Sequence, residues 1–334
     1  MIESERRSIV KLWHNSNDSI VARQVLITGA NGFLGHYISN VWVDAGAKVV
    51  SLGRSLGNDI ICDLGSAGPD LSGYTFDTVI HCAGKAHSIP RNDSDSTGFF
   101  RVNVEGTKKL LESISRSGKS PERVIFISSV AVYGRQEGLD IDETSDLDGV
   151  TPYAKSKIQA EQLVRDFSDK SGAAYFNFRL PLVVGTSPPG NLRSLWENIQ
   201  RGRYIRVAHN KARKSMVLAE DVAELTLKVD KESGAYNLTD REDVEFCEIE
   251  QAISDSCARL IRWSISPTIL KGICRTGDLF SLRLNRDLYT KLMSSLTYSS
   301  ELAVKNLGWE PRPCLDFIRE GGLSEQPGEA ITNV

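Results

Sequence analysis

Short runs of apolar residues alternate with amphipathic stretches over the first half of the chain. Between the runs, apolar residues recur at the spacing of one helix face, as Ile38, Val41 and Trp42 do. Strands that alternate with helices favour a parallel, doubly wound sheet, so the sequence predicts an α/β fold of that kind. The predicted strands occupy residues 24–28, 48–52, 78–82, 123–127 and 175–179.

The pattern becomes less regular after Pro181. Pro188, Pro189 and Gly190 indicate a loop, and mixed helical and short extended segments then continue to about Pro313. We therefore expect a smaller, mixed C-terminal lobe beside the doubly wound domain. The predicted parts are an N-terminal extension at 1–22, the doubly wound domain at 23–185 with later segments returning to it, the second lobe at 186–320 and a flexible tail at 321–334.

Composition places the chain among ordinary folded proteins. Its 334 residues are 40% hydrophobic and 25% charged, which allows a substantial core. The formal net charge is −3, and no sustained run of lysine and arginine stands out. This balance argues against nucleic acid or an anionic membrane surface as the main partner, and it favours a small molecule.

The cysteines and histidines give no sign of a metal site. None of the six cysteines forms a Cys-x-x-Cys pair, and the five histidines do not combine with them at ligand spacing. We expect no metal, and reduced, mostly buried thiols. The N-terminal residues are charged and lack the apolar core of a signal peptide, and no window is long and apolar enough to span a bilayer. We therefore expect a cytoplasmic protein.

Three glycines directly follow the first predicted strand, in the spacing Gly29-x-x-Gly32-x-x-Gly35. Glycines at a strand-to-helix turn allow a tight bend and bring backbone close to a pyrophosphate, and they expose the first helix amides to negative charge. The alternative is a structural turn that binds nothing. Because the turn lies in the first strand-helix unit, we interpret residues 23–185 as a dinucleotide-binding domain and 186–320 as mainly a substrate-binding lobe.

The end of the second strand indicates which dinucleotide binds. This position commonly carries an acid that holds the ribose hydroxyls of NAD, but here it carries Arg54 and Ser55. Because an arginine and a serine suit a 2′-phosphate, we favour NADP(H), while NAD(H) beside a solvent-facing arginine stays open. Asp63, followed by Leu64, is placed to accept a hydrogen bond from an adenine amino group, and the alternative is an ordinary loop aspartate.

A serine, a tyrosine and a lysine in a fixed order point to proton and hydride transfer. Ser129 closes the strand that begins at Arg123, at the sheet edge where ligands bind in open α/β folds. Tyr153 and Lys157 open a helix after Pro152, four residues apart and therefore on one face. A phenol titrates at about pH 10, so its use near neutrality requires a nearby cation, which Lys157 supplies. Tyr153 is the predicted catalytic acid or base.

Seven ordered segments carry a resemblance to a known family, namely 28–35, 63–64, 81–84, 102–107, 128–134, 152–157 and 307–311. With these segments the chain resembles an extended short-chain dehydrogenase/reductase of the NAD-dependent epimerase/dehydratase family, whose members act on nucleotide sugars. The resemblance runs from Gln24 to about Pro313, which is nearly the whole chain. It implies a Rossmann sheet with a mixed C-terminal substrate lobe.

By this resemblance Tyr153 is the acid or base, Lys157 holds the nicotinamide ribose and lowers the pKa of the tyrosine, and Ser129 hydrogen-bonds the reacting oxygen. The implied cofactor contacts are Gly29, Asn31, Gly32, Phe33, Leu34, Gly35, Arg54, Ser55, Asp63, Leu64, Cys82, Ala83, Gly84, Asn103, Tyr153, Lys157 and Pro181. The implied substrate contacts are His87, Asn191, Leu192, Arg213 and Lys214. The alternative for the basic pair is a solvated loop. A homodimer through paired helices is also implied.

The residues after Ser129 limit the reaction. Relatives that remove water between carbons 4 and 6 of the sugar carry an aspartate and a glutamate where this chain has Val130 and Ala131. Neither side chain can move a proton, so the sequence argues against a 4,6-dehydratase. The remaining chemistry is hydride transfer at carbon 4, either as net reduction of a 4-keto, 6-deoxy sugar or as 4-epimerisation.

Two features favour reduction. Arg54 at the ribose position suits NADPH as a consumable reductant, whereas an epimerase recycles bound NAD. The segment at 213–218 departs from the pattern common in hexose epimerases and, with 296–300, is more similar to bacterial reductases that make UDP-N-acetyl-quinovosamine. The alternatives are a UDP-hexose 4-epimerase and a non-catalytic dinucleotide sensor, which typically lacks the tyrosine or the lysine that this chain has.

Overall fold

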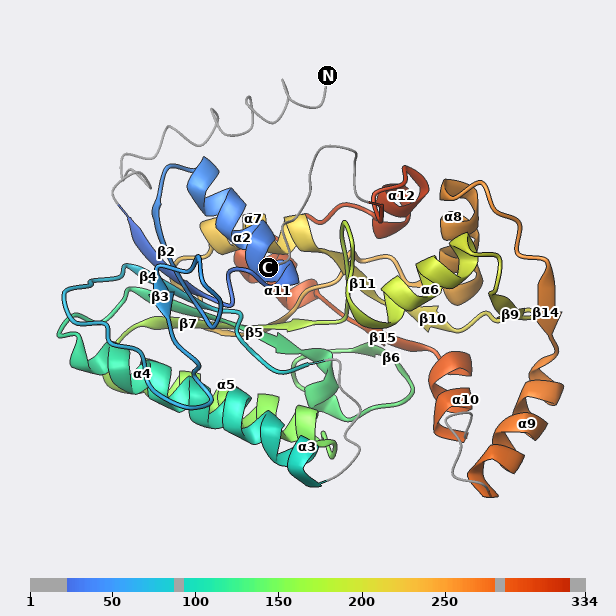
Figure 1. Cartoon of the computed structure of the whole chain (residues 1–334), viewed down its shortest axis with the longest axis horizontal. Coiled ribbons are helices and arrows are strands. Elements are labelled where there is room, and N and C mark those ends of the chain that lie inside the picture. The colour runs from blue at the N-terminus through green and yellow to red at the C-terminus, as the bar shows by residue number, and fades with distance from the viewer. Residues whose placement is uncertain (1–22, 87–92, 280–285, 325–334) are drawn as a thin grey trace.

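A seven-stranded parallel sheet forms the centre of the protein (Figure 1). The structure, a computed structural model, describes residues 23–86, 93–279 and 286–324. The sheet has the order β12-β7-β5-β4-β1-β2-β3, and every neighbouring pair is parallel. Its strands are β1 (Gln24–Thr28), β2 (Lys48–Gly53), β3 (Ile60–Ile61), β4 (Thr78–His81), β5 (Arg123–Ser129), β7 (Ala174–Leu180) and β12 (Gly234–Asn237). The predicted doubly wound α/β fold is confirmed.

The strand order reverses between β1 and β4, because the chain first moves outward through β2 and β3 and then crosses back to β4. Ligands of open α/β sheets bind beyond the carboxyl ends of the strands at such a switch point. The five predicted strands are all present, each within two residues of its predicted ends. The glycines after β1 and the residues after β4 therefore meet at one edge of the sheet.

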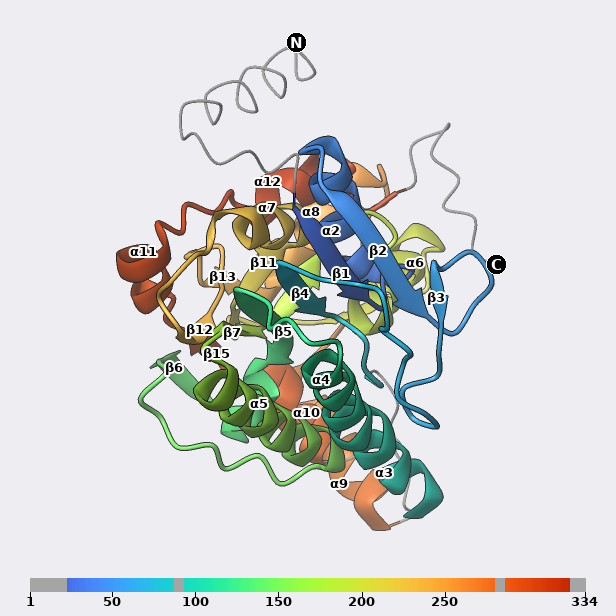
Figure 2. The same cartoon turned by 90° about the vertical axis from the view of Figure 1, so that its left-hand side faces the viewer.

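Helices cover both faces of the sheet (Figure 2). The helices α2 (Phe33–Asp44) and α7 (Ala219–Lys228) lie on one face, and α4 (Gly106–Arg116) and α5 (Pro152–Ser171) lie on the other. Alternate residues of β1 point to opposite faces, and both sets are buried. The core on the α2 side includes Val25, Ile27, Ile38, Trp42 and Val222, and the core on the α5 side includes Leu26, Leu110, Ile114, Ala160 and Val164. A strand that is apolar on both sides needs this double cover.

Three smaller sheets accompany the large one in the described part of the chain. A four-stranded sheet has the order β13-β10-β15-β6, and two parallel pairs, β8–β11 and β9–β14, accompany it. The strands are β6 (Gly138–Ile141), β8 (Leu182–Val184), β9 (Ile205–Val207), β10 (Arg213–Lys214), β11 (Met216–Leu218), β13 (Val244–Glu245), β14 (Trp263–Ile265) and β15 (Leu296–Tyr298). The remaining helices of the described chain are α3 (Asp93–Phe99), α6 (Gly190–Gln200), α8 (Phe246–Ser256), α9 (Pro267–Leu279), α10 (Arg286–Met293), α11 (Glu301–Leu307), α12 (Cys314–Arg319), a π-helix at Phe100–Glu105 and a 3₁₀ helix at Val130–Tyr133.

Segments that follow residue 185 return to the large sheet. The strand β12 pairs with β7, and α7 packs against α2 across the same face. The predicted extension at 1–22 and residues 325–334 of the predicted tail lie outside the described residues. The division into a cofactor domain and a substrate lobe near residue 185 therefore stays a proposal. Within the described residues, none of the helices combines the length and hydrophobicity of a membrane span.

A buried ion pair joins α5 to the middle of the sheet. Arg179 on β7 donates from Nε and Nη2 to the Glu161 carboxylate, with Nη2 2.7 Å from Oε2. The Ser128 hydroxyl on β5 donates to the same carboxylate. Burial alone would lower the pKa of Arg179, but the hydrogen bonds and charge of Glu161 raise it instead. These hydrogen bonds tie α5 to the two neighbouring strands β5 and β7.

The same arginine connects the sheet to the second lobe. Its Nη1 donates to the Tyr133 hydroxyl at 3.0 Å, and that hydroxyl donates to Asn237 Oδ1 at 2.7 Å. Asn237 in turn donates from Nδ2 to the carbonyls of Ile141 and Ser299, both at 3.1 Å. Because β6 and the residues after β15 supply those carbonyls, one network fixes the lobe relative to the sheet.

We predict that Glu161→Gln destabilises the fold strongly, because it leaves the Arg179 guanidinium buried without its carboxylate. The expected loss is about 3–5 kcal/mol in the free energy of unfolding, measured by urea denaturation. Exposed Glu112 on α4 offers a matched control, and Glu112→Gln is expected to change stability by less than about 0.5 kcal/mol. Equal losses in the two variants would contradict a dominant role for the buried pair.

Candidate active site

Two glycines that follow β1, Gly29 and Gly35, are packed too tightly to admit a side chain. Gly29 has a φ of 68°, and a Cβ there would lie 2.8 Å from the backbone nitrogen of Ala83. A Cβ on Gly35 would overlap the carbonyl oxygen of Gly29. The turn between β1 and α2 therefore packs directly against the residues after β4, at the switch point of the sheet.

The first turn of α2 carries no side-chain cap. Gly32 precedes the helix in an extended conformation, makes no side-chain hydrogen bond, and is followed by no acid in the first turn. The first amides of the helix, at Phe33 and Leu34, have no partner within the helix, and the helix dipole makes this end positive. With the glycine turn beside it, this end provides a cradle that suits a pyrophosphate.

The residues after β2 form a small polar cluster. The Ser55 hydroxyl accepts hydrogen bonds from Asn31 Nδ2 at 3.0 Å and from Asn58 Nδ2 at 3.2 Å. Arg54 is exposed beside it. Asp63 accepts from its own turn, from the Gly65 amide at 3.0 Å and the Ser66 hydroxyl. Leu64 is buried in the core. The structure thus brings Asn31 and Ser55 together and leaves the guanidinium of Arg54 in solvent.

Asn103 anchors the loop that follows β4. It lies in the π-helix, where its Oδ1 accepts from the Lys85 amide at 2.7 Å and its Nδ2 donates to the Ser156 hydroxyl at 2.9 Å. Ser156 donates to the Tyr153 carbonyl at 2.7 Å. A Cβ on Gly84 would lie 3.2 Å from Asn103 Oδ1. The π-helix, a form common at functional sites, therefore holds the loop against the first turn of α5.

Ser129 and Tyr153 meet at the carboxyl edge of the sheet. Ser129 is the last residue of β5 and caps the 3₁₀ helix by accepting from the Ala131 amide at 3.2 Å. Thr151 caps α5, and Pro152 occupies its first turn, so Tyr153 lies at the very start of the helix. Burial raises the pKa of Tyr153, and the neighbouring Ser129 hydroxyl lowers it. The two predicted side chains therefore lie near each other.

Lys157 lies one turn further along α5 and is buried. Its Nζ donates to the Ile127 carbonyl at 2.7 Å and lies 4.5 Å from the centre of the Phe126 ring. Burial lowers the pKa of Lys157 from 10.5 to about 8, which nearby Cys82 and Glu161 partly offset. A Cβ on Gly84 would lie 3.4 Å from Nζ. The ammonium therefore faces the loop after β4, where the resemblance implies a ribose.

Burial raises the pKa of Tyr153 above 10.0, and the Ser129 hydroxyl only partly opposes that effect. Phe99 covers the tyrosine ring edge-on, with ring centres 5.9 Å apart. Lys157 donates to the Ile127 carbonyl in this arrangement. The phenol is therefore protonated at neutral pH, and the expected lowering of its pKa by Lys157 stays a prediction.

Two titratable neighbours are held in their neutral forms. His81 accepts or donates at both ring nitrogens, 2.6 Å from the Thr28 hydroxyl and 2.9 Å from the Thr107 hydroxyl. Burial lowers the pKa of His81 to about 3 and raises that of Cys82 to about 12. A neutral, fully bonded imidazole and a protonated thiol hold the strand ends in place and move no proton near neutral pH.

The predicted substrate contacts in the second lobe are scattered. Leu192 packs into the apolar core of the lobe, and Asn191 is exposed in the first turn of α6. Lys214 donates to the carbonyls of Lys291 at 2.9 Å and Ser294 at 2.7 Å, which end α10. Arg213 is exposed. His87 lies outside the described residues, and Pro181 lies between β7 and β8.

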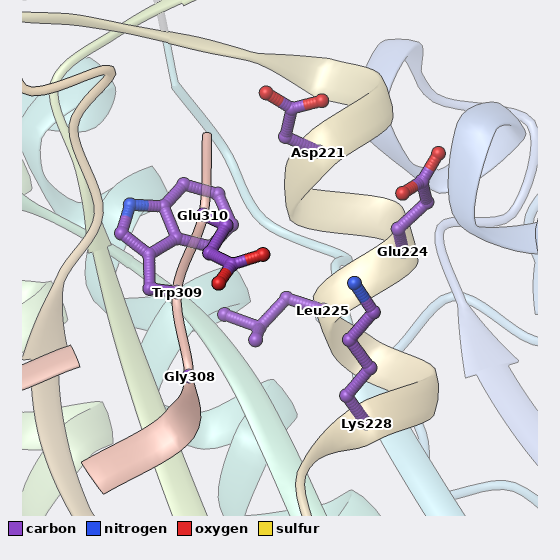
Figure 3. Close-up of a pocket in the computed structure, with 7 residues that line it drawn as sticks. All are labelled: Asp221, Glu224, Leu225, Lys228, Gly308, Trp309 and Glu310. Atoms are coloured by element: carbon purple, nitrogen blue, oxygen red, sulfur yellow. The ribbon is translucent and has the colours of Figure 1, made fainter. Parts of the chain in front are cut away.

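A second crevice lies on the other side of the sheet, between α7 and the segment after α11 (Figure 3). It is lined by Asp221, Glu224, Leu225, Lys228, Gly308, Trp309 and Glu310. Its volume is about 20 Å³, which holds little more than a water molecule. Burial raises the pKa of Asp221 and of Glu224. Since α7 and α5 cover opposite faces, this crevice is separate from Tyr153.

The residues that hold Ser129, Tyr153 and Lys157 in position were not identified from the sequence. Glu161 and Arg179 carried signals that were available: Glu161 follows Lys157 by four residues on one helix face, and Arg179 is a charged residue within a buried strand. Phe99 and Ser156 carried none, because their roles depend on how α3 packs on α5. Among the described residues, no group of three or more metal-ligating side chains occurs.

The parallel sheet, the glycine turn and the Ser-Tyr-Lys arrangement together define an extended short-chain dehydrogenase/reductase. The model of the NAD dependent epimerase/dehydratase family matches residues 25–239, and the chain belongs to that family.

Two curated relatives show the range of the similarity. Over 246 residues the chain is 28% identical to an N-acetyl-alpha-D-glucosaminyl-diphospho-ditrans,octacis-undecaprenol 4-epimerase of Escherichia coli O157:H7, covering 69% of this chain and 72% of the relative. Over 222 residues it is 31% identical to the UDP-glucose 4-epimerase of Homo sapiens, covering 55% of this chain. The match spans 63% of the human enzyme, which is less than two thirds of its length.

Two solved structures share the fold. MoeE5, in complex with UDP-glucose and NAD, superposes with a TM-score of 0.69 at 22% identity, over 89% of this chain and 99% of that one. RMD from Pseudomonas aeruginosa, complexed with NADPH, gives a TM-score of 0.69 at 20% identity, over 89% and 97%. One neighbour therefore binds NAD and the other NADPH.

We predict that Gly29→Ala destabilises the protein more than Gly202→Ala does. Both glycines have nearly the same backbone angle, with φ of 68° and 66°, but only Gly29 has backbone atoms where a Cβ would lie. The backbone angle alone costs an alanine about 1–2 kcal/mol. Urea denaturation is expected to give that loss for Gly202→Ala and a larger one for Gly29→Ala. Equal losses would contradict the close packing of the turn against Ala83.

Lys157→Met is expected to stabilise the protein at neutral pH. One unit of pKa shift corresponds to about 1.4 kcal/mol, so a charged Lys157 costs about 3 kcal/mol below pH 8, of which its hydrogen bond returns a part. Between about pH 8 and 10.5 the unfolded chain binds the extra proton, so wild-type stability rises with pH. The advantage of Lys157→Met, measured by denaturation at several pH values, should therefore shrink across this window. A constant advantage would contradict a buried charge.

Proposed function

We propose that the protein is an NAD(P)-dependent oxidoreductase that transfers hydride at carbon 4 of a nucleotide-linked sugar, most readily by reducing a 4-keto, 6-deoxy sugar. The observation that carries the proposal is the placement of Ser129 at the end of β5 and of Tyr153 at the start of α5, at the edge of the sheet that also carries the glycine turn. Family membership and relatives that are sugar 4-epimerases support the carbon position.

The residues suit the reduction of a ketone. In this mechanism a nicotinamide cofactor supplies the hydride. Ser129 and Tyr153 donate hydrogen bonds to the keto oxygen, and Tyr153 transfers its proton as the alkoxide forms. A tyrosine whose pKa is raised by burial is protonated at neutral pH, which is the form that this step requires. The ammonium of Lys157 lies one helical turn away and compensates the phenolate that remains.

The cofactor would be held by groups that the structure brings to one edge. Gly29, Gly32 and the first amides of α2 suit a pyrophosphate, and Lys157 and the backbone after Cys82 suit the nicotinamide ribose. NADP(H) is favoured over NAD(H) because Arg54 is exposed beside Ser55 and no carboxylate points to this position from β2. Family membership supports a nicotinamide cofactor of either kind.

The second candidate is 4-epimerisation, in which hydride leaves carbon 4 and returns to its other face. Both curated relatives described above are 4-epimerases, which favours this reaction. Tyr153 would then act first as a base and afterwards as an acid. The E. coli relative acts on a sugar joined through a diphosphate to a lipid, so the carrier of the sugar is also open within this proposal.

A 4,6-dehydratase is not proposed, because Val130 and Ala131 occupy the turn after Ser129 and neither can move a proton. We propose a homodimer through paired helices, as the family resemblance implies, and a cytoplasmic location. The substrate would be held between the sheet edge and the lobe, with Asn191 and Arg213 as its exposed polar contacts.

The reaction is tested by mass spectrometry of UDP- and GDP-linked sugars and their 4-keto, 6-deoxy forms, incubated with and without NADPH. A product heavier by two hydrogens is expected with NADPH, whereas an unchanged mass with a different sugar would indicate epimerisation. Tyr153→Phe should lower turnover about 10²–10⁴-fold and still bind the cofactor in a calorimetric titration. Tyr74→Phe, a change of the same kind on the stacked pair with Phe76, is the control.

Full turnover by Tyr153→Phe would refute its role as the proton donor. Cofactor binding without any change of these sugars would favour the dinucleotide sensor instead.

A further inference from the structure

Two stretches of the chain contain no acidic residue, although the protein as a whole is acidic. Residues 198–219 hold six lysines and arginines, and residues 256–277 hold four, without an aspartate or glutamate in either. The whole chain has 43 acidic residues and a net charge of −3. Such local asymmetry marks a surface with its own electrostatic potential.

The fold brings these stretches together. The strand β9 lies in the first and β14 in the second, and they pair in parallel with Ile205 beside Trp263. The helix α9 begins two residues after β14 and, with it, lies at the outer edge of the second lobe (Figure 1). Figure 2 also places α9 at the periphery of the molecule. The surface formed by β9, β14 and α9, with residues 203–204 and 259–262 just before the two strands, is called the lobe-edge surface below.

Large apolar side chains project from the lobe-edge surface. Leu260 is 81% exposed, Trp263 65%, Ile269 59% and Ile205 56%. Single exposed apolar residues are ordinary on a protein, but several on adjoining elements mark an interaction site. The tryptophan adds a specific feature, since its amphipathic ring favours the boundary between water and lipid.

The helix α9 is anchored on one side only. Leu270 and Cys274, one turn apart, are buried against Val207 and the residues of α10. Ile269 and Ile273, also one turn apart, lie on the neighbouring face and are exposed. The packing therefore fixes which apolar residues face outward, and their exposure does not arise from a helix that lacks a core contact.

Cations lie on the same segments as the exposed apolar residues. Arg203, Arg259, Arg262, Lys271 and Arg275 are exposed and form no ion pair with an acid in the described part of the chain. By contrast, Arg201 and Arg206 of the same stretches pair with Glu197 and Glu250. Among the described side chains, no acid therefore pairs with these five cations of the lobe-edge surface.

A cavity of about 230 Å³ adjoins α9, and positively charged side chains line it. It lies between α9 and α10 and is lined by Lys271, Cys274, Arg275, Arg286, Tyr289 and Thr290. The Lys271 Nζ lies 5.9 Å from the centre of the Tyr289 ring, which holds the ammonium at the cavity. The cavity lining thus includes the two cations Lys271 and Arg275 of the lobe-edge surface, a pair that suits a phosphate group.

We propose that the lobe-edge surface binds an anionic lipid bilayer, with Trp263, Ile269 and Leu260 at the headgroup boundary and the cations on lipid phosphates. Apolar residues that project among unpaired lysines and arginines are the combination that holds a protein at such a surface. The sequence-based expectation that no membrane is a partner rested on the net charge, which averages over this asymmetry. The proposal is independent of the reaction at Tyr153.

A second copy of the chain fits this surface less well. A two-fold contact would place the cations of each copy against those of the other, with no acid in either stretch to relieve the repulsion. A bilayer supplies both the opposite charge and the apolar phase.

The test is co-sedimentation of the full chain with vesicles of phosphatidylcholine alone and with vesicles that also contain phosphatidylglycerol. We expect binding to the anionic vesicles that weakens as salt is added. Lys271→Glu/Arg275→Glu should reduce the partition coefficient at least about tenfold, and so should Trp263→Ser/Ile269→Ser. Since all four side chains are exposed, unfolding midpoints should stay close to wild type, which circular dichroism checks.

The matched control is Lys231→Glu/Lys305→Glu, the same change of charge at exposed lysines outside the two stretches, which should bind as wild type does. The proposal is overturned if anionic vesicles bind no better than neutral ones, or if both charge-reversed variants lose binding equally. Self-association that Trp263→Ser/Ile269→Ser abolishes, without vesicle binding, would assign the surface to a second copy instead. Turnover of soluble sugars is not part of this test, so its outcome does not depend on the proposed reaction.

Discussion

The pair of Glu161 and Arg179 is the contact on which the geometry of the candidate site depends. Its carboxylate accepts from β5 through Ser128 and from β7 through Arg179, while the glutamate itself belongs to α5. Ser129 and Tyr153 come from two of these same elements. Burying two charges is costly, and only the multiple hydrogen bonds make it tolerable. The pair fixes positions: the end of β5 and the start of α5 cannot shift without breaking a hydrogen-bond network that extends through Tyr133 to Asn237.

Burial, more than interaction with charged partners, sets the direction of the pKa shifts of Tyr153 and Lys157. Lys157 has a lowered pKa and Tyr153 a raised one, so burial disfavours the charged form of both. Lys157 donates to the Ile127 carbonyl, whereas Tyr153 lies beside Ser129, so the two groups have different partners. A proton transfer from Tyr153 would create the phenolate that makes a charged Lys157 less costly. The same low dielectric that opposes each charge alone strengthens their attraction once both are present.

The sheet and the glycine turn could be predicted because local rules govern them. Five-residue apolar runs and glycines at a strand-to-helix turn have few other structural uses, and the predicted strands lie within two residues of the observed ones. Long-range packing decided the rest. Lys214 has the composition of a phosphate ligand, yet it caps α10, which is far away in sequence. Leu192 lies in a loop-like segment, yet its side chain is in a core. The direction of the Tyr153 shift required knowing that Phe99 and α3 cover the ring.

The net charge of the chain did not indicate the lobe-edge surface, because that surface also depends on long-range packing. Net charge sums over the whole chain, whereas a ligand meets the potential within about a Debye length of one face, roughly 8 Å at physiological salt. Arg259 and Lys271 are exposed and form no ion pair within the described part of the chain, whereas acids such as Glu112 and Glu220 lie on α4 and α7, the helices that cover the large sheet (Figure 2). Pairing of β9 with β14 concentrates the two acid-free stretches, which lie about 60 residues apart in sequence, on one edge. The fold therefore brings cationic and apolar residues of two separate segments onto one face, although neither segment alone contains a sustained run of lysine and arginine.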